Sequence, residues 1–516
     1  MHSVHPSQTA GPSRPIRFFH RGAIVEVDAA APTRTVLEWL REDARCTGSK
    51  EGCNEGDCGA CTVVIGELPG EATAGGPEMV GGLRLTTANA CIQFLPTLDG
   101  KALFTVEDLQ RADGSQHAVQ GAMVDCHASQ CGFCTPGFVM SLWAAYQHHA
   151  AGGTRPTRQE LADELSGNLC RCTGYRPILD AGERMFDLPA SPCDTAPAVA
   201  ALESIASAET FRYAPPGGGE FVAPRTLQAF AAERAAKPEA RVLAGSTDIG
   251  LWVNKMFREL PSLLYIGGVE ALKCIEERDG TLSIGAAASL EDGWRALVAR
   301  WPSLVDVWLR FAGMPLRHCG TMGGNVANGS PIGDSPPVLM ALGAGLVLRR
   351  GERVRRLALA DFYAGYMQNR LEPGEFVQAI EVPLDAHVAV RAYKISKRFD
   401  CDISALCAGF AIALDDGGAV RTARFAFGGM AATVQRAAAA EAAVVGKPWD
   451  AAAVAAAQRA LDTDFTPLTD MRASAAYRRK VAKNLIQRLW LETRANAPLA
   501  ANETSVWDRT HTAARS

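Results

Sequence analysis

The chain has 516 residues, more than a single hydrophobic core usually supports, so we expect three or four domains that each bury their own apolar surface. Apolar residues make up 47%, charged residues 21% and the formal net charge is −4, which excludes the basic excess of nucleic-acid-binding proteins. No run of about 20 apolar residues is present and the first residues lack the apolar stretch of a secretory signal, so we expect a cytoplasmic protein without membrane contact.

The N-terminal part has the pattern of a small α+β unit. Residues 16–28 alternate apolar and polar side chains as a β-hairpin does, and residues 33–40 have the pattern of a short helix. A strand-like run, TVVIG, follows Cys61, and a glycine-rich loop precedes Cys91. We therefore predict a first domain over residues 14–108.

The spacing of the apolar residues becomes helical after this unit. The sequence predicts one helix over residues 137–149 and another over residues 157–165. Thr157 and Glu160 stand at the spacing of a capping box, which would begin the second helix. These helices indicate a second, helical domain over residues 115–187.

A stretch rich in Pro, Ala, Gly and Ser, residues 188–222, is typical of a linker between domains. Strand and helix patterns alternate after it, which predicts an α+β domain over residues 223–385 that could hold a large ligand. The last predicted domain, residues 388–495, combines strands near residues 407–414 and 422–427 with an Ala-rich helical end.

The 15 cysteines are placed unevenly, because ten lie at or before Cys172 and five are scattered over the remainder. In a reducing cytoplasm such a set is not expected to be a disulfide framework, so metal binding is the leading interpretation. The cysteines outside ligand spacings are expected to be buried small hydrophobic residues or plain thiols. They are Cys46, Cys126, Cys193, Cys274, Cys319, Cys401 and Cys407.

The first group of cysteines has the spacing of a plant-type ferredoxin, in which four thiolates hold two irons. Three members come from one tight loop, GCNEGDCGAC, and the fourth from a distant strand. Glycines suit a loop that brings its N–H groups close to the sulfides and adopts positive φ. Structural zinc is the alternative, although zinc sites usually show two paired arms. The predicted ligands are Cys53, Cys58, Cys61 and Cys91.

A second group consists of two close cysteine pairs in the helical region, one in SQCGFCTPG and one in GNLCRCTGYRP. Helix N-termini near such pairs offer N–H groups to an anionic centre, which favours a second 2Fe-2S cluster. On spacing alone, a four-cysteine zinc site is a stronger alternative here than at the first group. Two adjacent clusters would conduct electrons, whereas one cluster beside a zinc ion has no evident purpose. The predicted ligands are Cys131, Cys134, Cys170 and Cys172.

Two glycine-rich stretches predict a nucleotide-binding site, VLAGSTDIG at residues 242–250 and TMGGNVANGSPIGDSPP at residues 321–337. Gly, Ser and Thr let backbone N–H groups turn onto a pyrophosphate, and Asn325 and Asp334 can bond ligand hydroxyls and amides. A Rossmann fingerprint is missing, since GAGLVL at Gly343 lacks the third glycine. Taken alone, loops of this composition are more often only turns.

Five motifs in this order, GCNEGDCGACTV, SQCGFCTPG, LCRCTGYRP, AGSTDIG and MGGNVANGSPIGD, resemble the xanthine dehydrogenase and aldehyde oxidase family of molybdenum hydroxylases. The resemblance runs from about Ile16 to Leu491. It implies a multidomain α+β chain. Its parts would be a β-grasp 2Fe-2S domain, a four-helix 2Fe-2S domain, an FAD-binding domain of the vanillyl-alcohol-oxidase type and a C-terminal α+β domain like that of the CO dehydrogenase flavoprotein.

The resemblance also implies roles for individual residues. The helical cluster would lie nearest a molybdopterin, with Gln130 touching the pterin, and the ferredoxin-like cluster would lie nearest the flavin. The ring of Phe311 would face the flavin, and NAD+ would dock at Tyr366 and Asp400. The positions matching the family's FAD contacts are Val242, Leu243, Ala244, Gly245, Ser246, Thr247, Asp248, Ile249, Phe311, Thr321, Asn325, Asp334, Val377 and Lys394.

By this resemblance the chain is expected to be an electron-transfer subunit without a catalytic base of its own. It would take electrons from a separate molybdopterin-binding large subunit, in a heterodimer or α2β2 heterotetramer, through two 2Fe-2S clusters to FAD and then NAD+. The partner would oxidise hypoxanthine and xanthine to urate. The alternatives are the same role with an aldehyde, another N-heterocycle or an aromatic acyl-CoA, oxygen as acceptor in place of NAD+, and a non-catalytic redox sensor without flavin.

Overall fold

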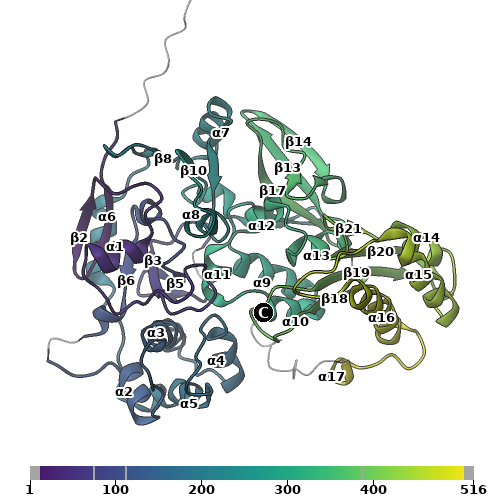
Figure 1. Ribbon diagram of the computed structural model, residues 1–516, viewed down its shortest axis with the longest axis horizontal. Coiled ribbons are helices and arrows are strands. Elements are labelled where there is room, and N and C mark those ends of the chain that lie inside the picture. Colours follow the sequence, from purple (N-terminus) through teal and green to yellow (C-terminus); the bar gives the residue numbers. More distant parts are fainter. Residues whose placement is uncertain (1–11, 74–75, 111–112, 386, 505–516) are drawn as a thin grey trace, which may run out of the picture. The chain divides into compact units, whose positions relative to one another are not determined.

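A computed structural model describes residues 12–73, 76–110, 113–385 and 387–504 of the chain (Figure 1). The chain divides into two compact units. The N-terminal unit comprises Met1–Leu161 and Leu169–Ala271, and the C-terminal unit comprises Ala162–Asn168 and Leu272–Ser516. Within the described ranges, no helix is both long and apolar enough to cross a lipid bilayer.

The N-terminal unit begins with a six-stranded mixed sheet in the order β2-β1-β6-β3-β5-β4, and the predicted hairpin is its β1–β2 pair. Helix α1 (Val36–Glu42) starts three residues later than expected, because Thr35 caps it. The Thr35 hydroxyl accepts the Glu38 N–H, and the Glu38 carboxylate accepts the Thr35 N–H. The strands are β1 (Ile16–His20), β2 (Ala23–Val27), β3 (Thr62–Glu67), β4 (Met79–Val80), β5 (Leu83–Asn89) and β6 (Ala102–Phe104).

Four helices follow in the region for which the sequence predicted a helical pattern. Helix α3 is buried over most of its length, so it is apolar on nearly every side instead of carrying one apolar stripe. The predicted capping box begins α4, because the Thr157 N–H donates to the Glu160 carboxylate at 2.7 Å and the Glu160 N–H donates to Thr157 Oγ1 at 3.2 Å. The helices are α2 (Ala118–Asp125), α3 (Thr135–Ala151), α4 (Arg158–Glu164) and α5 (Arg176–Arg184).

The stretch expected to be a linker, residues 188–222, contains regular structure, so it is more than an irregular connection. Its Ala-rich centre forms α6 (Ala196–Ile205), because alanine has the highest helix propensity and outweighs the neighbouring prolines. Strand β7 (Phe211–Tyr213) and the first residues of β8 (Glu220–Ala223) also lie in this stretch. Both strands belong to a four-stranded sheet in the order β7-β8-β10-β9.

In this second sheet, β8, β10 and β9 run parallel and are joined by helices, whereas β7 pairs antiparallel with β8. Strand β10 (Ser262–Tyr265) pairs in parallel with β8 and with β9 (Arg241–Leu243). Helix α7 (Leu227–Ala236) connects β8 to β9, and α8 (Ile249–Asn254) precedes β10. The loop after β9 therefore stands at the carboxyl end of a parallel strand, where α/β sheets usually bind ligands.

The C-terminal unit opens with a five-stranded antiparallel sheet in the order β11-β12-β17-β13-β14. The GAGLVL stretch enters β13, as its structural interpretation predicted. The strands are β11 (Ile275–Arg278), β12 (Thr281–Gly285), β13 (Gly345–Arg350), β14 (Arg353–Ala358) and β17 (Phe376–Pro383), with a separate hairpin of β15 (Tyr363–Gly365) and β16 (Gln368–Asn369). The helices are α9 (Leu290–Arg300), α10 (Val305–Arg310), α11 (Met314–Cys319), α12 (Met322–Asn328) and α13 (Ser335–Ala341).

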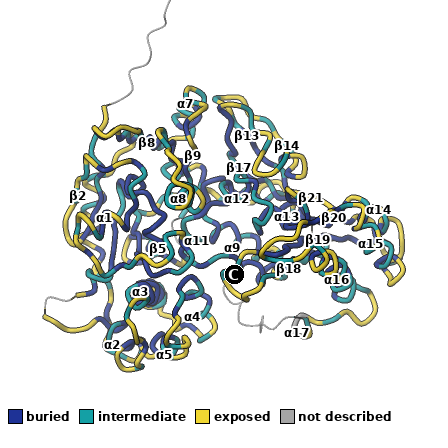
Figure 2. The backbone as a smooth tube through the Cα atoms, viewed as in Figure 1, coloured by how far each residue is buried: buried dark blue, intermediate teal, exposed yellow. Residues whose placement is uncertain are grey.

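The last part of this unit is a four-stranded antiparallel sheet in the order β18-β19-β20-β21. Strand β19 is buried along nearly its whole length (Figure 2), because it lies between two strands and also contacts helices α13 and α16. The elements are β18 (Ala389–Ile395), β19 (Leu406–Leu414), β20 (Val420–Gly428), β21 (Gln435–Arg436), α14 (Ala438–Val444), α15 (Ala451–Asp464), α16 (Ala475–Thr493) and α17 (Ala501–Thr504).

A buried carboxylate joins separate parts of the N-terminal unit. Asp99 accepts two hydrogen bonds from the Arg14 guanidinium, at 2.6 and 2.8 Å, and one from Arg225 at 3.0 Å. It also accepts the backbone N–H of Arg17 at 3.1 Å. The Asp99 side chain is 4% exposed, so these groups replace the water that the carboxylate loses on burial. The contact ties the first sheet to the segment that follows β8.

We expect Asp99→Asn to lower the free energy of unfolding by about 2–4 kcal/mol, because it leaves two arginines beside a neutral amide. The measurement is chemical denaturation followed by circular dichroism. Glu26→Gln is the control, since the Arg17–Glu26 pair is 3.7 Å apart and largely exposed and such pairs contribute about 0–1 kcal/mol. Equal effects of the two substitutions would contradict the role given to Asp99.

Candidate redox centres

Strand pairing brings together the ends of the ferredoxin-type cysteine motif. Strands β3 and β5 are antiparallel, with Thr62 opposite Asn89. Cys61 directly precedes β3, and a single residue, Ala90, stands between the end of β5 and Cys91. The Ala90 N–H donates to the Cys61 carbonyl at 3.3 Å. The two cysteines, 30 positions apart in the sequence, are therefore neighbours in the fold, and both are buried.

The four thiols of this motif share hydrogen bonds. The Cys58 N–H donates to Cys53 Sγ at 3.4 Å, and hydrogen bonds from the Cys58 and Cys91 thiols hold the pKa of Cys53 far below its ordinary value. A hydrogen bond from Cys91 likewise lowers the pKa of Cys61. Thiols that lie within hydrogen-bonding range of one another can, once deprotonated, bind soft metal ions in place of their protons.

The loop backbone explains its glycines. Gly56 and Gly59 have φ of 81° and 69°, as the sequence predicted for a loop that turns its N–H groups inward. Gly52 serves a different purpose, because a Cβ added there would lie 2.8 Å from Cys58 Sγ. This loop therefore leaves no room for a side chain beside the sulfur.

Helix starts position the second group of thiols. Cys134 is the N-cap of α3, while Cys170 and Cys172 lie in the turn before α5. A backbone N–H of Phe133 and a hydrogen bond with Cys172 lower the pKa of Cys131, and burial together with a hydrogen bond to Cys170 raises the pKa of Cys134. The four thiols therefore interact as two pairs, each joining one residue near α3 to one near α5.

These sulfurs are not gathered around a single point. Among the described residues, no group of three or more His, Cys, Asp or Glu side chains is arranged to hold one metal ion. A 2Fe-2S cluster is wider than one ion, because four sulfur ligands surround two irons and two sulfides. The donor set, four thiolates in each group, fits such a cluster.

The two cysteine loops pack directly against each other in the N-terminal unit. The Leu169 N–H, one residue before Cys170, donates to the Cys58 carbonyl at 3.0 Å. A Cβ added to Gly137 would lie 2.1 Å from the Gly59 carbonyl oxygen, so the start of α3 touches the ferredoxin-type loop backbone to backbone. A single hydrogen bond therefore links the predicted ligand Cys58 to Leu169, the residue before the predicted ligand Cys170.

The loop after β9 carries the first predicted nucleotide contacts. Ser246 has φ of 61°, is 3% exposed, and its Oγ has no hydrogen-bond partner within the described structure. A buried hydroxyl without a partner is costly unless a ligand supplies one. The backbone N–H groups of the Gly, Ser and Thr residues around it are also suited to donate to a pyrophosphate. The predicted positions run from the end of β9 (Val242, Leu243) through the loop (Ala244, Gly245, Ser246, Thr247, Asp248) to the first residue of α8 (Ile249).

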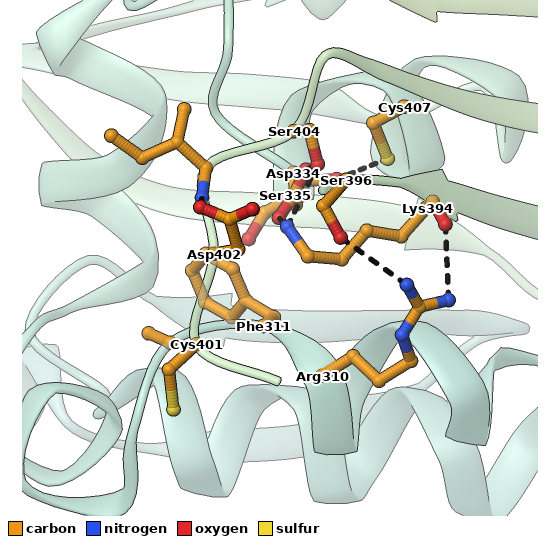
Figure 3. Close-up of polar contacts among 12 residues, drawn as sticks. Arg310, Phe311, Asp334, Ser335, Lys394, Ser396, Cys401, Asp402, Ser404 and Cys407 are labelled. Atoms are coloured by element: carbon orange, nitrogen blue, oxygen red, sulfur yellow. Dashed lines mark hydrogen bonds and ion pairs between the residues drawn. The ribbon is translucent and has the colours of Figure 1, made fainter. Parts of the chain in front are cut away.

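In the C-terminal unit, Asp334, Lys394 and Ser404 form one buried polar network (Figure 3). The Lys394 ammonium donates to Asp334 Oδ2 at 2.6 Å and to Ser404 Oγ at 2.8 Å, and the Ser404 hydroxyl donates to Asp334 Oδ1 at 2.6 Å. The structure thus brings together two residues that the sequence analysis predicted separately. It adds Ser404, which the sequence analysis missed because a serine carries no signal of burial.

The remaining predicted flavin contacts of this unit have different surroundings. Asn325 Oδ1 is buried and has no hydrogen-bond partner in the described part of the chain, which fits a ligand donor. Thr321 caps α12, since its Oγ1 accepts the Gly324 N–H at 3.0 Å. Val377 lies on β17 within the hydrophobic core. Phe311 is 8% exposed and follows α10.

A buried ion pair that the sequence analysis missed supports the Phe311 turn. Arg317 is fully buried and donates from Nε to Glu291 Oε2 at 2.6 Å. Its Nη1 donates to the carbonyls of Phe311 at 3.2 Å and Ala312 at 2.9 Å, and Ala312 has φ of 52°. Although burial alone raises the pKa of Glu291, Arg317 lowers it below its ordinary value. Charged residues usually lie at the protein surface, so the sequence alone does not indicate that this pair is buried.

The residues predicted to meet the partner and NAD+ are exposed. Gln130 stands at the surface directly before Cys131, which is itself exposed. Tyr366 is 65% exposed at the tip of the β15–β16 hairpin, and Asp400 lies in the exposed loop between β18 and β19. Their roles stay predictions.

Four family models match consecutive parts of the chain. They are the 2Fe-2S iron-sulfur cluster binding domain at residues 18–92, the 2Fe-2S binding domain at residues 105–183, the FAD binding domain in molybdopterin dehydrogenase at residues 214–385 and the CO dehydrogenase flavoprotein C-terminal domain at residues 391–493. The chain thus contains two 2Fe-2S domains and an FAD-binding domain, and the predicted multidomain α+β fold is confirmed.

Curated relatives and solved structures agree with these matches. The xanthine dehydrogenase of Emericella nidulans is 30% identical over 92% of this chain and 38% of that protein. The xanthine dehydrogenase/oxidase of Gallus gallus is 28% identical over 81% of this chain and 35% of that protein. A carbon monoxide dehydrogenase from Hydrogenophaga pseudoflava, in a form lacking the Mo-pyranopterin moiety, matches with a TM-score of 0.50 and 28% identity over 52% of this chain and 95% of that chain.

The chain spans about a third of the length of the curated relatives it matches. Both iron-sulfur domains, the FAD-binding domain and the C-terminal domain follow one another in a single polypeptide. The chain therefore belongs to the molybdenum hydroxylase family, in which it corresponds to the iron-sulfur and FAD-binding region.

Proposed function

We propose that this chain is the electron-transfer subunit of a xanthine dehydrogenase. It would accept electrons from a molybdopterin-binding partner that oxidises hypoxanthine and xanthine to urate, and deliver them to NAD+. When bound, two 2Fe-2S clusters supply one-electron transfer and FAD links it to the two-electron chemistry of NAD+. The observation that carries the proposal is the unbroken run of contacts in the N-terminal unit from the helical cysteine loop to the loop after β9.

The contacts give this run a definite order. The helical loop touches the ferredoxin-type loop through the Leu169–Cys58 hydrogen bond. At the other side of the ferredoxin-type site, the Gln93 side-chain amide, two residues after Cys91, donates to the Gly245 carbonyl at 2.9 Å. The ferredoxin-type site thus lies between the helical site and the predicted pyrophosphate loop along this run. The order supports electron flow toward the flavin.

The helical cysteine site presents a face suited to a partner subunit. Cys131 and Cys172 are exposed, and three large apolar side chains near them in the sequence are exposed as well, Val124 at 60%, Phe133 at 46% and Tyr175 at 41%. Exposed apolar groups around a functional site are typical of protein interfaces. We infer that the molybdopterin-binding subunit covers this face in a heterodimer or heterotetramer, with Gln130 reaching its pterin.

The C-terminal unit would provide access for NAD+. The exposed Tyr366 and Asp400 belong to different surface loops, and an aromatic ring with a carboxylate suits a nicotinamide nucleotide, through stacking and through hydrogen bonds to hydroxyls. The Arg317–Glu291 pair fixes the Phe311 turn, which would keep that ring in place against the flavin.

The substrate depends on the partner, since this chain offers no purine-binding site of its own in the proposal. An aldehyde, another N-heterocycle or an aromatic acyl-CoA would call for the same relay. Identifying the large subunit that copurifies with this chain, and assaying purines against aldehydes with NAD+ and with oxygen as acceptors, distinguishes these cases. Turnover of aldehydes alone would overturn the xanthine dehydrogenase assignment and leave the relay intact.

We expect about four irons and four labile sulfides per chain. Cys131→Ser or Cys170→Ser should remove one of two reduced-cluster signals in electron paramagnetic resonance and leave the flavin absorbance unchanged. Cys126→Ser is the matched control, because Cys126 lies five residues before Cys131 outside the predicted ligand set. Zinc in place of iron, or both signals surviving in the ligand variants, would contradict the assignment.

We expect Ser246→Ala to weaken FAD binding about tenfold, since the ligand loses one hydrogen bond. The apoprotein should keep its unfolding free energy, because Ser246 Oγ has no partner within the described structure. Equilibrium dialysis of FAD and denaturation of the apoprotein measure the two effects. Ser204→Ala, at an exposed hydroxyl of α6, is the control. Destabilised apoprotein with unchanged FAD affinity would argue against a flavin contact.

We expect the purified chain, with clusters and FAD but without its partner, to reduce an artificial dye with NADH. It should not oxidise xanthine, because the proposal places purine chemistry in the partner. Dye-reduction and xanthine-oxidation assays on one preparation, with molybdenum content measured alongside, make the comparison. Xanthine turnover by a molybdenum-free sample would refute this division of labour.

A further inference from the structure

A side chain of the FAD-binding domain contacts the ligand loop of the ferredoxin-type site. Asn254, the last residue of α8, donates from Nδ2 to the Cys91 carbonyl at 2.7 Å. The same nitrogen lies 3.1 Å from Asn54 Oδ1 and 3.4 Å from the Asn54 carbonyl. The carbonyl of Cys91 can only accept, so the amide nitrogen of Asn254 faces it. The Asn254 amide therefore bridges the predicted ligand Cys91 and Asn54, the neighbour of the predicted ligand Cys53.

The backbone around Asn254 holds this contact in place. A Cβ added to Gly250 would lie 2.8 Å from both Cβ and the carbonyl oxygen of Ile92, so α8 packs against the turn that carries Cys91 without a side chain of Gly250 between them. The Gln93 amide bonds Gly245 at the other end of the same helix and loop. Residues 91–93 and 245–254 are thereby fixed to one another at three points within the N-terminal unit.

Electrostatics gives the Asn254 amide a direction of effect. Reducing a 2Fe-2S cluster by one electron adds negative charge to it and its ligands. An N–H group that donates to the carbonyl of a ligand residue offsets the negative end of that carbonyl dipole, and so weakens the repulsion between the carbonyl and the added charge. This effect favours the reduced form of the cluster over the oxidised form.

We propose that Asn254 is a positioning residue that raises the reduction potential of the cluster held by Cys53, Cys58, Cys61 and Cys91. The inference deepens the proposed function, on which it rests, because it requires a 2Fe-2S cluster at that site. A raised potential at the cluster beside the flavin loop draws electrons away from the helical cluster. Asn254 thus makes the direction of transfer a property of the FAD-binding domain as well as of the cluster domains.

The test is a potentiometric titration of the full chain, with the two clusters followed separately by electron paramagnetic resonance. Asn254→Asp replaces the donor by a carboxylate of the same shape. It should lower the equilibrium constant for one-electron reduction of the ferredoxin-type cluster at least tenfold, which equals 59 mV for a one-electron couple. Asn254→Ala removes the donor without adding charge and should lower it about threefold. The helical cluster is the internal reference and should titrate unchanged in both variants.

A matched control exists in the C-terminal unit. Asn369→Asp changes a half-buried amide that also donates to a backbone carbonyl, that of Ala327 at 2.7 Å, and it should leave both clusters unchanged. If Asn254→Asp binds no ferredoxin-type cluster at all, the milder Asn254→Ala variant decides the test. If both clusters of Asn254→Ala titrate as in the parent chain, the inference is overturned while the cluster assignment stands. Absence of any ferredoxin-type cluster signal in the parent chain would overturn the proposed function instead.

Discussion

The candidate redox sites depend first on the pairing of strands and helices, which brings together thiols that are distant in the sequence. The register of β3 against β5, with Thr62 opposite Asn89, sets Cys61 beside Cys91. A shift of this register by one residue would turn the side chains of one strand to the opposite face and separate the thiols. The helical site depends on the starts of α3 and α5 in the same way.

Close backbone packing joins the redox sites of this unit. Gly137 against Gly59 and Gly250 against Ile92 leave no space for a methyl group, and neither Gly137 nor Gly250 has positive φ. Glycine at these positions therefore permits close approach instead of an unusual backbone conformation. Each added side chain would lengthen the path between sites, so packing density and electron transfer place the same demand on the sequence.

The C-terminal unit relies on buried charge instead. Arg317 with Glu291, and Lys394 with Asp334, are ion pairs shielded from water. Such pairs contribute little net stability because desolvation offsets their attraction, but they fix geometry when every donor is used. Arg317 also bonds two carbonyls of the Phe311 turn, and Lys394 also bonds Ser404. Each pair thereby holds in place a segment that carries predicted flavin contacts, the Phe311 turn in one case and Asp334 in the other.

The sequence by itself determined the spacing of the two cysteine motifs, the glycine-rich loops, the capping box at Thr157 and the order of the domains, because each is a matter of local spacing and residue type. Only the tertiary structure decided which distant groups meet. Three contacts join residues whose local sequences do not indicate their partner. They are Arg317 with Glu291, Ser404 with Lys394, and Asn254 with Cys91. Burial is a property of the packed chain, so a charged or amide side chain in the sequence gives no sign that it will be enclosed. Composition was also an incomplete guide at α6. It indicated a linker, whereas the helix propensity of alanine and the burial of Ala198 and Leu202 give this segment regular structure.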